Sequence, residues 1–386
     1  MALSKIDVAN MLTGLVPNDN TIRRKNAKPI IINGNMAVAQ RATSATGKTG
    51  TGYYTCDRIN CEINSIGTYT ITQESLTSGN AFNNGFANAW RIDTTTADAS
   101  PSANDYLFLN TILEGQDLQL FKKGTSNAQK FTLAFWVKSN KTGTGNVNFR
   151  DRDNARFIGG TYTISSADTW EHKVVNFAAD TTGAFADDNG GSLEIEWWLD
   201  GGSNFNTGAT PTAWEAFSHA DRNPSGTLDI ADNTANDWAI TGIQLEVGEF
   251  SSTTLPPFQH ESFGDNLSRC QRYFNILMNS GTERTDSINA HIHDNDTMRG
   301  SIHFPVEMRS TPSVTSSSSG SADHWRYISN GINTNYGSAI TMSASSKSAQ
   351  FTLVDTGGTN VQSNVNEPGQ IFNNTTSCFL KIDAEL

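Results

Sequence analysis

Alternation of apolar and polar residues constrains the fold of this 386-residue chain more than any other feature. It is clearest in the runs Phe131–Val137, Leu193–Leu199 and Ala239–Val247. Side chains on a strand point to opposite faces in turn, so each run predicts a strand with one face in a core. In the third run, the odd-numbered residues from Ala239 to Val247 are assigned to that core. Breaks rich in Gly, Asp and Asn separate the runs, and this spacing predicts an all-β fold, an antiparallel β-sandwich of the jelly-roll type.

Composition and charge exclude several classes of protein. The formal net charge is −12, so no basic field is available to replace the counterions of a nucleic acid. No apolar run approaches the roughly 20 residues of a membrane helix, so membrane insertion is not expected. The four cysteines fit neither a zinc module nor a redox motif, and we expect free, mostly buried thiols. No cofactor is predicted.

Changes of pattern divide the chain into four segments. Residues 1–29 form a basic N-terminal arm, 30–261 the β-sandwich, 262–278 a connecting helix and 279–386 a smaller C-terminal β domain. Residues 1–30 hold five basic and two acidic residues in an otherwise acidic protein. The arm is expected to attach the chain to another protein, and the alternative is that it lies on its own acidic domain.

The connecting helix is predicted from a change of period. Apolar residues recur with a 4-3-4-3 spacing at Phe263, Leu267, Cys270, Phe274 and Leu277. This spacing is heptad-like, but two heptads do not by themselves establish a coiled coil. A threefold seam between chains and a single helix packed on the sandwich are therefore both open.

The chain carries a family resemblance. Asn233–Phe274 contains, in order, a predicted strand (WAITGIQLEV), a proline turn (LPPF) and a predicted helix (NLSRCQRYF). This order resembles the end of the carbohydrate-binding-module-like sandwich of bacteriophage tail fibre and virion surface proteins. Five further segments, the first of them the expected opening strand, resemble earlier parts of that sandwich: INGNMAVAQRA (Ile32–Ala42), YYTCDRI (Tyr53–Ile59), FTLAFWVKS (Phe131–Ser139), WEHKVVNF (Trp170–Phe177) and DNGGSLEIEWWL (Asp188–Leu199).

The resemblance implies a setting and partners. The chain is expected to be a phage tail fibre or related virion appendage, assembled in the host cytoplasm and forming a homotrimer. The arm would join another virion tail or adaptor protein, and the remainder would contact the host cell surface, with glycan as one candidate receptor. The alternatives are a capsid-decorating or head-surface virion protein, and a stand-alone carbohydrate-binding protein.

No catalytic or metal site is predicted, and we expect no enzyme. Glycosidases need two carboxylates across the scissile bond, and Glu194 and Glu196 share one face of a predicted strand. A solvated strand face would show the same pair, and no nucleophile elbow, phosphate-binding loop or zinc-protease helix motif occurs. His291-Ile292-His293 is the sharpest metal candidate, but an exposed histidine pair is favoured there.

Three tryptophans form the candidate carbohydrate site. On the alternation pattern, Trp136, Trp198 and Trp238 each lie on the polar side of a strand, and Trp198 shares its face with Glu196. An indole beside carboxylates and amides suits a sugar, whose C–H face stacks while its hydroxyls take hydrogen bonds. The alternative is that loops or a neighbouring subunit cover this second face.

Overall fold

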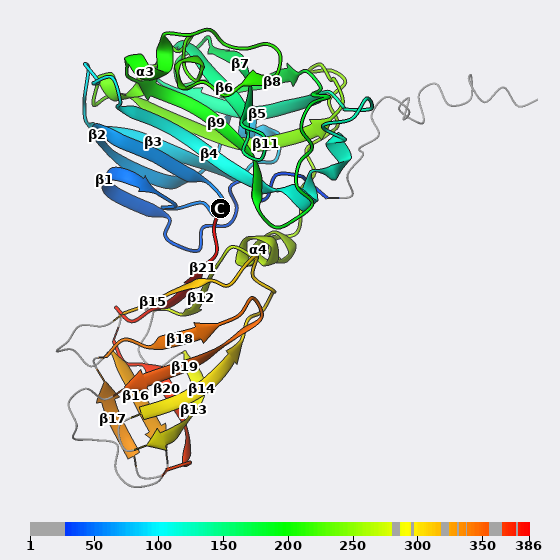
Figure 1. Ribbon diagram of the computed structural model, residues 1–386. Helices are drawn as coiled ribbons and strands as arrows, with labels where there is room; N and C mark the ends of the chain where they lie inside the picture. Colours follow the sequence, from blue (N-terminus) through cyan, green and yellow to red (C-terminus); the bar gives the residue numbers. More distant parts are fainter. Residues whose placement is uncertain are drawn as a thin grey trace, which may run out of the picture. The chain divides into compact units, whose positions relative to one another are not determined.

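The computed structural model describes residues 28–279, 286–294, 297–317, 324–329, 332–336, 338–354, 365–375 and 377–386. The chain divides into two compact units, Met1–Glu261 and Ser262–Leu386. Antiparallel strands dominate both, which confirms the predicted all-β class (Figure 1). The predicted arm lies outside the described residues up to residue 27. None of the helices in the described ranges has the length and apolar composition of a membrane span.

The first unit is built on one long, curved sheet. Its order is β10-β7-β6-β9-β4-β2-β3-β11-β5-β8, and β1 pairs with β2 beside this path. The strands are β1 (Ser44–Gly52), β2 (Asn60–Ser75), β3 (Asn88–Thr96), β4 (Tyr106–Glu114), β5 (Phe131–Ser139), β6 (Gly143–Asp151), β7 (Arg156–Ile164), β8 (Glu171–Phe177), β9 (Gly191–Gly201), β10 (Glu215–Ala216) and β11 (Asp237–Val247). The helical elements are α2 (Gly79–Asn83), α3 (Ser203–Asn206) and the 3-10 turns η1 (Gly115–Asp117), η2 (Gln119–Phe121), η3 (His219–Asp221) and η4 (Ile230–Asp232).

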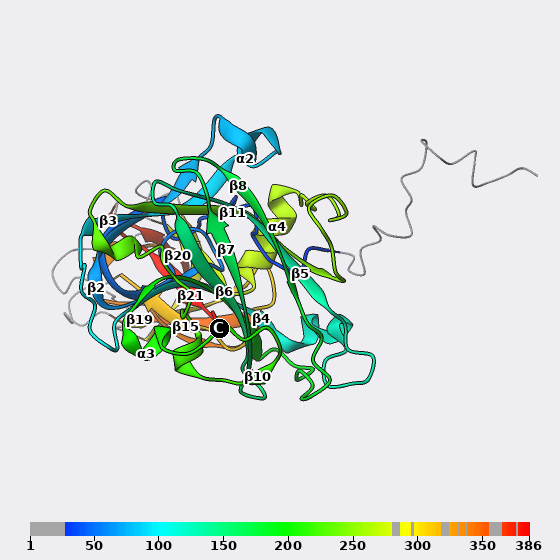
Figure 2. The same ribbon diagram turned by 90° about the horizontal axis from the view of Figure 1, so that it is seen from above.

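Strand β2 belongs to both layers of the sandwich. Its first part, Asn60–Asn64, pairs with β4, and its second part, from Thr68 to Ser75, pairs with β3. Between them, Ser65 and Gly67 have φ values of 54° and 63°, which bend the strand. One layer therefore contains β4, β9, β6 and β7, and the other contains β3, β11, β5 and β8 (Figures 1 and 2).

Aromatic side chains from the two layers meet in the core. The rings of Phe135 on β5 and Trp197 on β9 lie 5.9 Å apart and nearly perpendicular. Phe131 on β5 and Phe149 on β6 meet in the same way, at 4.8 Å. Edge-to-face contacts of this kind add to the free energy gained by burying the rings. The predicted core faces of β5 and β9 are therefore correct.

The predicted face assignment of β11 is wrong for its first half. Two residues of β11, Gly242 and Ile243, stand opposite Phe135 of β5, so the strand contains a β-bulge. Gly242 has a φ of 62°, a conformation that glycine adopts without steric cost. The bulge inverts the faces on its N-terminal side, so Trp238 lies in the core and Ala239 lies on the opposite face.

The expected opening strand at Ile32–Ala42 does not form. Asn33 has a φ of 59° and its side chain closes a turn: its Nδ2 donates to the Val38 carbonyl at 2.8 Å and its Oδ1 accepts from the Val38 amide at 2.9 Å. An Asn side chain that bonds nearby backbone N–H and C=O groups in this way favours a turn over the hydrogen-bond ladder of a strand. The first strand of the described residues begins instead at Ser44.

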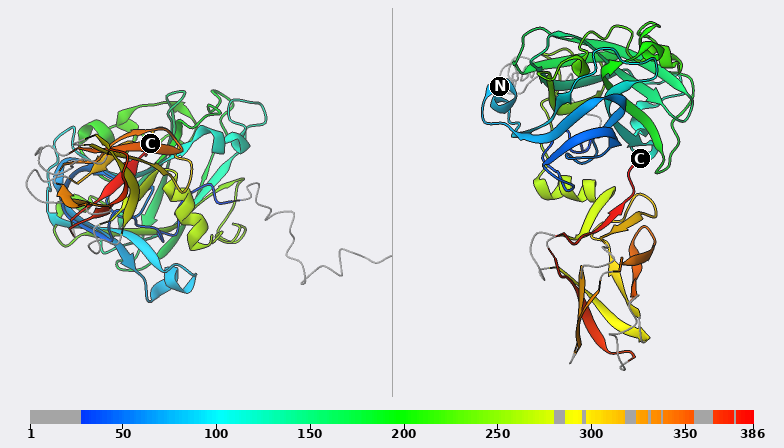
Figure 3. Two further views of the ribbon diagram at one scale, coloured as in Figure 1. Left: turned by 90° about the horizontal axis from the view of Figure 1, so that it is seen from below. Right: turned by 90° about the vertical axis from the view of Figure 1, so that its left-hand side faces the viewer.

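In its described residues, the second unit contains one helix and two sheets (Figure 3). The strand orders are β12-β21-β15 in the smaller sheet and β17-β16-β20-β13-β14-β19-β18 in the larger one. Its core includes Met278 from the smaller sheet and Ile292, Phe351 and Ile371 from the larger one. The elements are α4 (Phe263–Gln271), β12 (Phe274–Met278), β13 (Ser287–Asp294), β14 (Thr297–His303), β15 (Ser313–Ser316), β16 (Trp325–Ser329), β17 (Ile332–Tyr336), β18 (Thr341–Ala344), β19 (Ser348–Val354), β20 (Pro368–Asn373) and β21 (Leu380–Asp383).

The predicted connecting helix is shorter than 262–278. Ser262 caps α4, because its hydroxyl accepts a hydrogen bond from the Asp265 amide at 3.2 Å. The helix ends at Gln271, and Phe274 and Leu277 lie on β12, which pairs with β21. The heptad-like row therefore does not run along one helix.

Candidate functional site

The outer face of β4, β9 and β6 carries three rows of paired side chains. Phe108, Trp198 and Asn146 form the first row, and Asn110, Glu196 and Asn148 the second. Ile112, Glu194 and Arg150 form the third. Facing positions on neighbouring antiparallel strands hold their side chains close together, so this face is a continuous surface of aromatic and polar groups.

Arg222 covers the middle of this face. It donates from Nε and Nη2 to the two carboxylate oxygens of Glu196, at 2.9 and 2.7 Å. Its guanidinium also lies 4.5 Å from the centre of the Trp198 ring, a cation–π distance. Phe205 of α3 packs against the same indole at 5.2 Å. Glu196 and Trp198 are consequently buried beneath the segment that follows β9.

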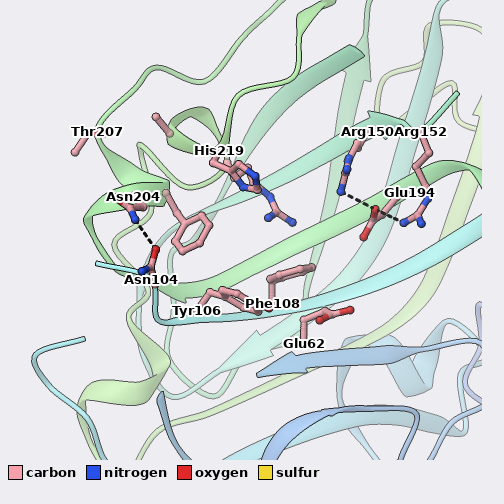
Figure 4. A pocket seen from close by; sticks show the side chains of 13 residues that line it. Glu62, Asn104, Tyr106, Phe108, Arg150, Arg152, Glu194, Asn204, Thr207 and His219 are labelled. Carbon is pink, nitrogen blue, oxygen red and sulfur yellow. Dashed lines mark hydrogen bonds and ion pairs between the residues drawn. The ribbon is translucent and has the colours of Figure 1, made fainter. Parts of the chain in front are cut away.

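A groove of about 650 Å³ lies beside this covered region (Figure 4). Phe108 of β4, Glu194 of β9 and Arg222 are among the residues that line it. A volume of this size is in the range that small ligands occupy.

One end of the groove has an aromatic side chain flanked by amides. Tyr106 at the start of β4 is half-buried, and its ring lies 5.5 Å from Phe205 and perpendicular to it. Asn104 and Asn204 are exposed and joined by a hydrogen bond between their side chains (Figure 4). Burial raises the pKa of Tyr106, and Glu62 adds to this effect, so the phenol keeps its proton at neutral pH.

The other end is basic. Arg150 and Arg152 approach one Glu194 oxygen at 3.6 and 2.9 Å (Figure 4). The other Glu194 oxygen accepts from Asn110 at 2.6 Å. Burial raises the pKa of Glu194, and repulsion from Glu196 adds to it, against the opposing effect of these donors. The guanidinium of Arg150 also rests over the Phe217 ring at 4.3 Å, which fixes its plane.

Two of the four predicted site residues come together, since the Trp198 indole donates to Glu196 at 2.8 Å, and the other two lie elsewhere. Glu196 and Trp198 lie under the covering segment next to the groove, and Trp238 is fully buried in the core, where it contacts Trp90 at 6.3 Å. Trp136 is half-exposed on the outer face of the opposite layer, stacked on His172 at 4.9 Å. Of the four, Trp136 alone is only partly buried.

The groove residues themselves were missed from the sequence. Tyr106 and Phe108 alternate with Leu107 and Leu109, which lie in the core, so the period-two pattern could have placed both rings on an outer face. Arg152 offered no such signal, because it lies in the turn after β6 and reaches Glu194 only through the pairing of β6 with β9.

In the part of the chain that the structure describes, no group of three His, Cys, Asp or Glu side chains is arranged to hold a metal ion. His291 and His293 share one face of β13 with ring centres 6.3 Å apart. All four cysteines are free and buried, as predicted.

Comparisons with known proteins find partial matches among solved structures. Protein-family models and curated protein sequences give no match. The enzymatically active domain of tailspike protein 4 of bacteriophage CBA120 matches at a TM-score of 0.29 and 11% identity, over 57% of this chain and 21% of that one. The CBM22-1–GH10 modules of Clostridium thermocellum xylanase 10B, in complex with xylohexaose, match at a TM-score of 0.28 and 10% identity, over 58% of this chain and 29% of that one. TmCBM61 in complex with β-1,4-galactotriose matches at a TM-score of 0.27 and 7% identity, over 57% of this chain and 99% of that one. The chain thus spans less than a third of the first two proteins.

Proposed function

We propose that the first unit is a carbohydrate-binding domain and that the groove beside Tyr106 holds the glycan. The observation that carries the proposal is the half-buried Tyr106 ring flanked by the exposed amides of Asn104 and Asn204. An aromatic face accepts the C–H face of a sugar, and neighbouring amides exchange hydrogen bonds with its hydroxyls. The ring is held by its contact with Phe205, so the groove is formed before ligand arrives.

Binding is favoured over catalysis by the state of the two acids in the groove. Both oxygens of Glu194 already contact Asn110 and Arg152. Glu62 accepts from Asn60 at 2.8 Å on one oxygen and from Thr51 at 2.8 Å on the other. A general acid or base must come within hydrogen-bond reach of the substrate, and the Glu194 side chain is only 4% exposed beneath its protein donors. We therefore propose a protein without glycosidase activity.

The wider setting of this domain rests on the sequence resemblance described above. We propose a phage tail fibre or related virion appendage that contacts the host surface through the groove and joins the particle through residues 1–29. A homotrimer is part of the proposal, and light scattering should then give about three times the chain mass of 41.9 kDa. A capsid-decorating protein and a stand-alone carbohydrate-binding protein remain the alternatives, and labelling the C-terminus on intact particles would separate the three.

The binding proposal is tested with the full chain by affinity electrophoresis through gels that contain host-surface and plant polysaccharides. Wild-type protein should be retarded by at least one of them. Tyr106→Ala should weaken that retardation about tenfold, because the stacking face is lost. Trp136→Ala is the matched control on the opposite layer and should leave retardation unchanged. Loss of binding in Trp136→Ala, with Tyr106→Ala unaffected, would place the site on the other face.

A further inference from the structure

Hydrogen-bonding capacity in the groove is unevenly used. Three arginines and two glutamates line it, in a protein of net charge −12. The glutamate oxygens accept hydrogen bonds from protein donors, whereas most N–H groups of Arg150 and Arg152 have no protein acceptor among the described residues. Among the described residues, the side chain of Arg152 donates one hydrogen bond, to Glu194, and that of Arg150 donates none. A guanidinium carries five N–H donors, so Arg150 and Arg152 have donors left over for an acceptor on a ligand.

The two arginines are also placed to reach a ligand. About a third of each side chain is exposed, 34% for Arg150 and 39% for Arg152. Their shared partner Glu194 is only 4% exposed, so it neutralises part of the charge from beneath. Arg150 is held flat by Phe217, and its Nε has no hydrogen-bond partner in the described residues although it is buried. The donors that a ligand can reach are therefore the N–H groups on the exposed part of each guanidinium.

We infer that the groove recognises an acidic saccharide, with a sugar carboxylate held by Arg150 and Arg152 while a neighbouring ring stacks on Tyr106. This inference rests on the proposed function of the same groove. A planar guanidinium binds a carboxylate through two parallel hydrogen bonds, which are stronger than those between neutral groups. The third arginine, Arg222, is paired with Glu196 and takes no part in binding the sugar carboxylate.

The experiment compares matched acidic and neutral ligands. Binding to the full chain is measured by titration calorimetry with oligomers of polygalacturonate, alginate and hyaluronan. Each acidic oligomer is compared with its carboxyl-reduced form, which has the same backbone but an alcohol in place of the carboxylate. At least one acidic form should bind about tenfold or more tightly than its reduced partner. Raising the salt concentration should weaken that preference, because the arginines are partly exposed. Dextran sulfate serves as a generic polyanion and should bind more weakly than the preferred carboxylate-bearing oligomer.

Variants locate the preference. Arg152→Gln should remove most of the preference for the acidic form. Arg152→Lys should also reduce this preference, because lysine keeps the charge but cannot make the bidentate contact of a guanidinium. The double variant Arg152→Gln/Glu194→Gln removes both charges and guards against a folding defect from an unpaired buried acid. Lys130→Gln is the control, since it removes a cation that is 58% exposed and paired with Glu249 outside the groove.

The outcomes separate the two claims. Equal binding of acidic and reduced forms, with Arg152→Gln unchanged, would overturn the acidic class and leave carbohydrate binding standing. Equal or tighter binding of dextran sulfate would also overturn the carboxylate assignment. Failure of every polysaccharide in both the gel and the calorimeter would overturn the proposed function itself.

Discussion

Arg222 and Glu196 form a buried, two-bonded ion pair in which the side chains are 6% and 0% exposed. Glu196 comes from the middle of β9, and Arg222 follows η3, so the pair fastens the covering segment onto the sheet. Its Oε2 also accepts from the Trp198 indole at 2.8 Å. The groove exists in its present form because this segment is held there.

Removing one partner of this pair should destabilise the first unit strongly. Arg222→Met leaves an uncompensated buried carboxylate, which costs about 3–5 kcal/mol in proteins. The double variant Arg222→Met/Glu196→Leu should recover part of that loss, because no buried charge remains. Urea denaturation measures both. Lys130→Met, which breaks an exposed pair with Glu249, should change stability by less than about 1 kcal/mol. Equal small effects of Arg222→Met and Lys130→Met would mean that the segment is not fastened in solution.

Trp197 and Trp198 should both be intolerant of truncation, although they point to opposite faces of β9. Trp197 lies in the core, and Trp198 stacks on Phe108 at 4.7 Å beneath Arg222. Loss of a buried indole costs about 3–5 kcal/mol, so Trp197→Ala and Trp198→Ala should lower the melting temperature similarly. Trp136→Ala, at a half-exposed ring, should lower it less. A Trp198→Ala variant as stable as Trp136→Ala would contradict the covered outer face.

Asp200 should make stability fall between acidic and neutral pH. Burial raises the pKa of Asp200 to about 7, and repulsion from Asp229 and Asp232 adds to it. The unfolded carboxyl titrates near 4, so between these values the folded state binds more protons. Stability contributed by protonated Asp200 is therefore present at low pH, is lost as pH rises towards 7 and is constant above that.

The variant Asp200→Asn tests this assignment by removing the titration. Its stability relative to wild type should improve by about 2.6 kcal/mol between pH 5 and pH 8. Urea denaturation at pH 5, 6.5 and 8 measures the change. Asp187→Asn removes an exposed carboxylate and is the control. Parallel pH profiles for Asp200→Asn and wild type would show that Asp200 is ionised throughout.

Deleting residues 1–28 should leave a folded β protein that no longer joins particles. The described structure of the first unit has its first strand at Ser44, so the sheet does not depend on the deleted residues. Circular dichroism checks folding, and co-sedimentation with particles checks attachment. Normal incorporation of the truncated chain would place the attachment site elsewhere.

Strand faces could be predicted wherever the alternation is unbroken. β5 has the predicted bounds, Phe131–Ser139, and Phe135 meets Trp197 in the core as the pattern requires. The first half of β11 could not be assigned, because the bulge at Gly242 shifts the register by one residue and inverts every face before it. A glycine inside a strand pattern is the local sign of such a bulge.

Burial of the second face was beyond local patterns. The polar alternation of β9 correctly places Glu196 and Trp198 away from the core, but it says nothing about what lies above them. Phe205 and Arg222 reach this face from a segment that follows the strand without regular periodicity. The same holds for the groove, whose lining includes residues of β2, β4, β6, β9, α3, η3 and the turn after β6.

Hydrogen–deuterium exchange of the full chain, with and without a bound oligosaccharide from the polysaccharide panel, tests the location of the glycan site most directly. The groove site predicts slower exchange in peptides that contain residues 104–108, 150–152 and 203–207, which line one outer face. Peptides of β5 and β8 around Trp136 and His172 should exchange unchanged. Protection confined to those β5 and β8 peptides, or to the second unit, would contradict a glycan site in the groove beside Tyr106.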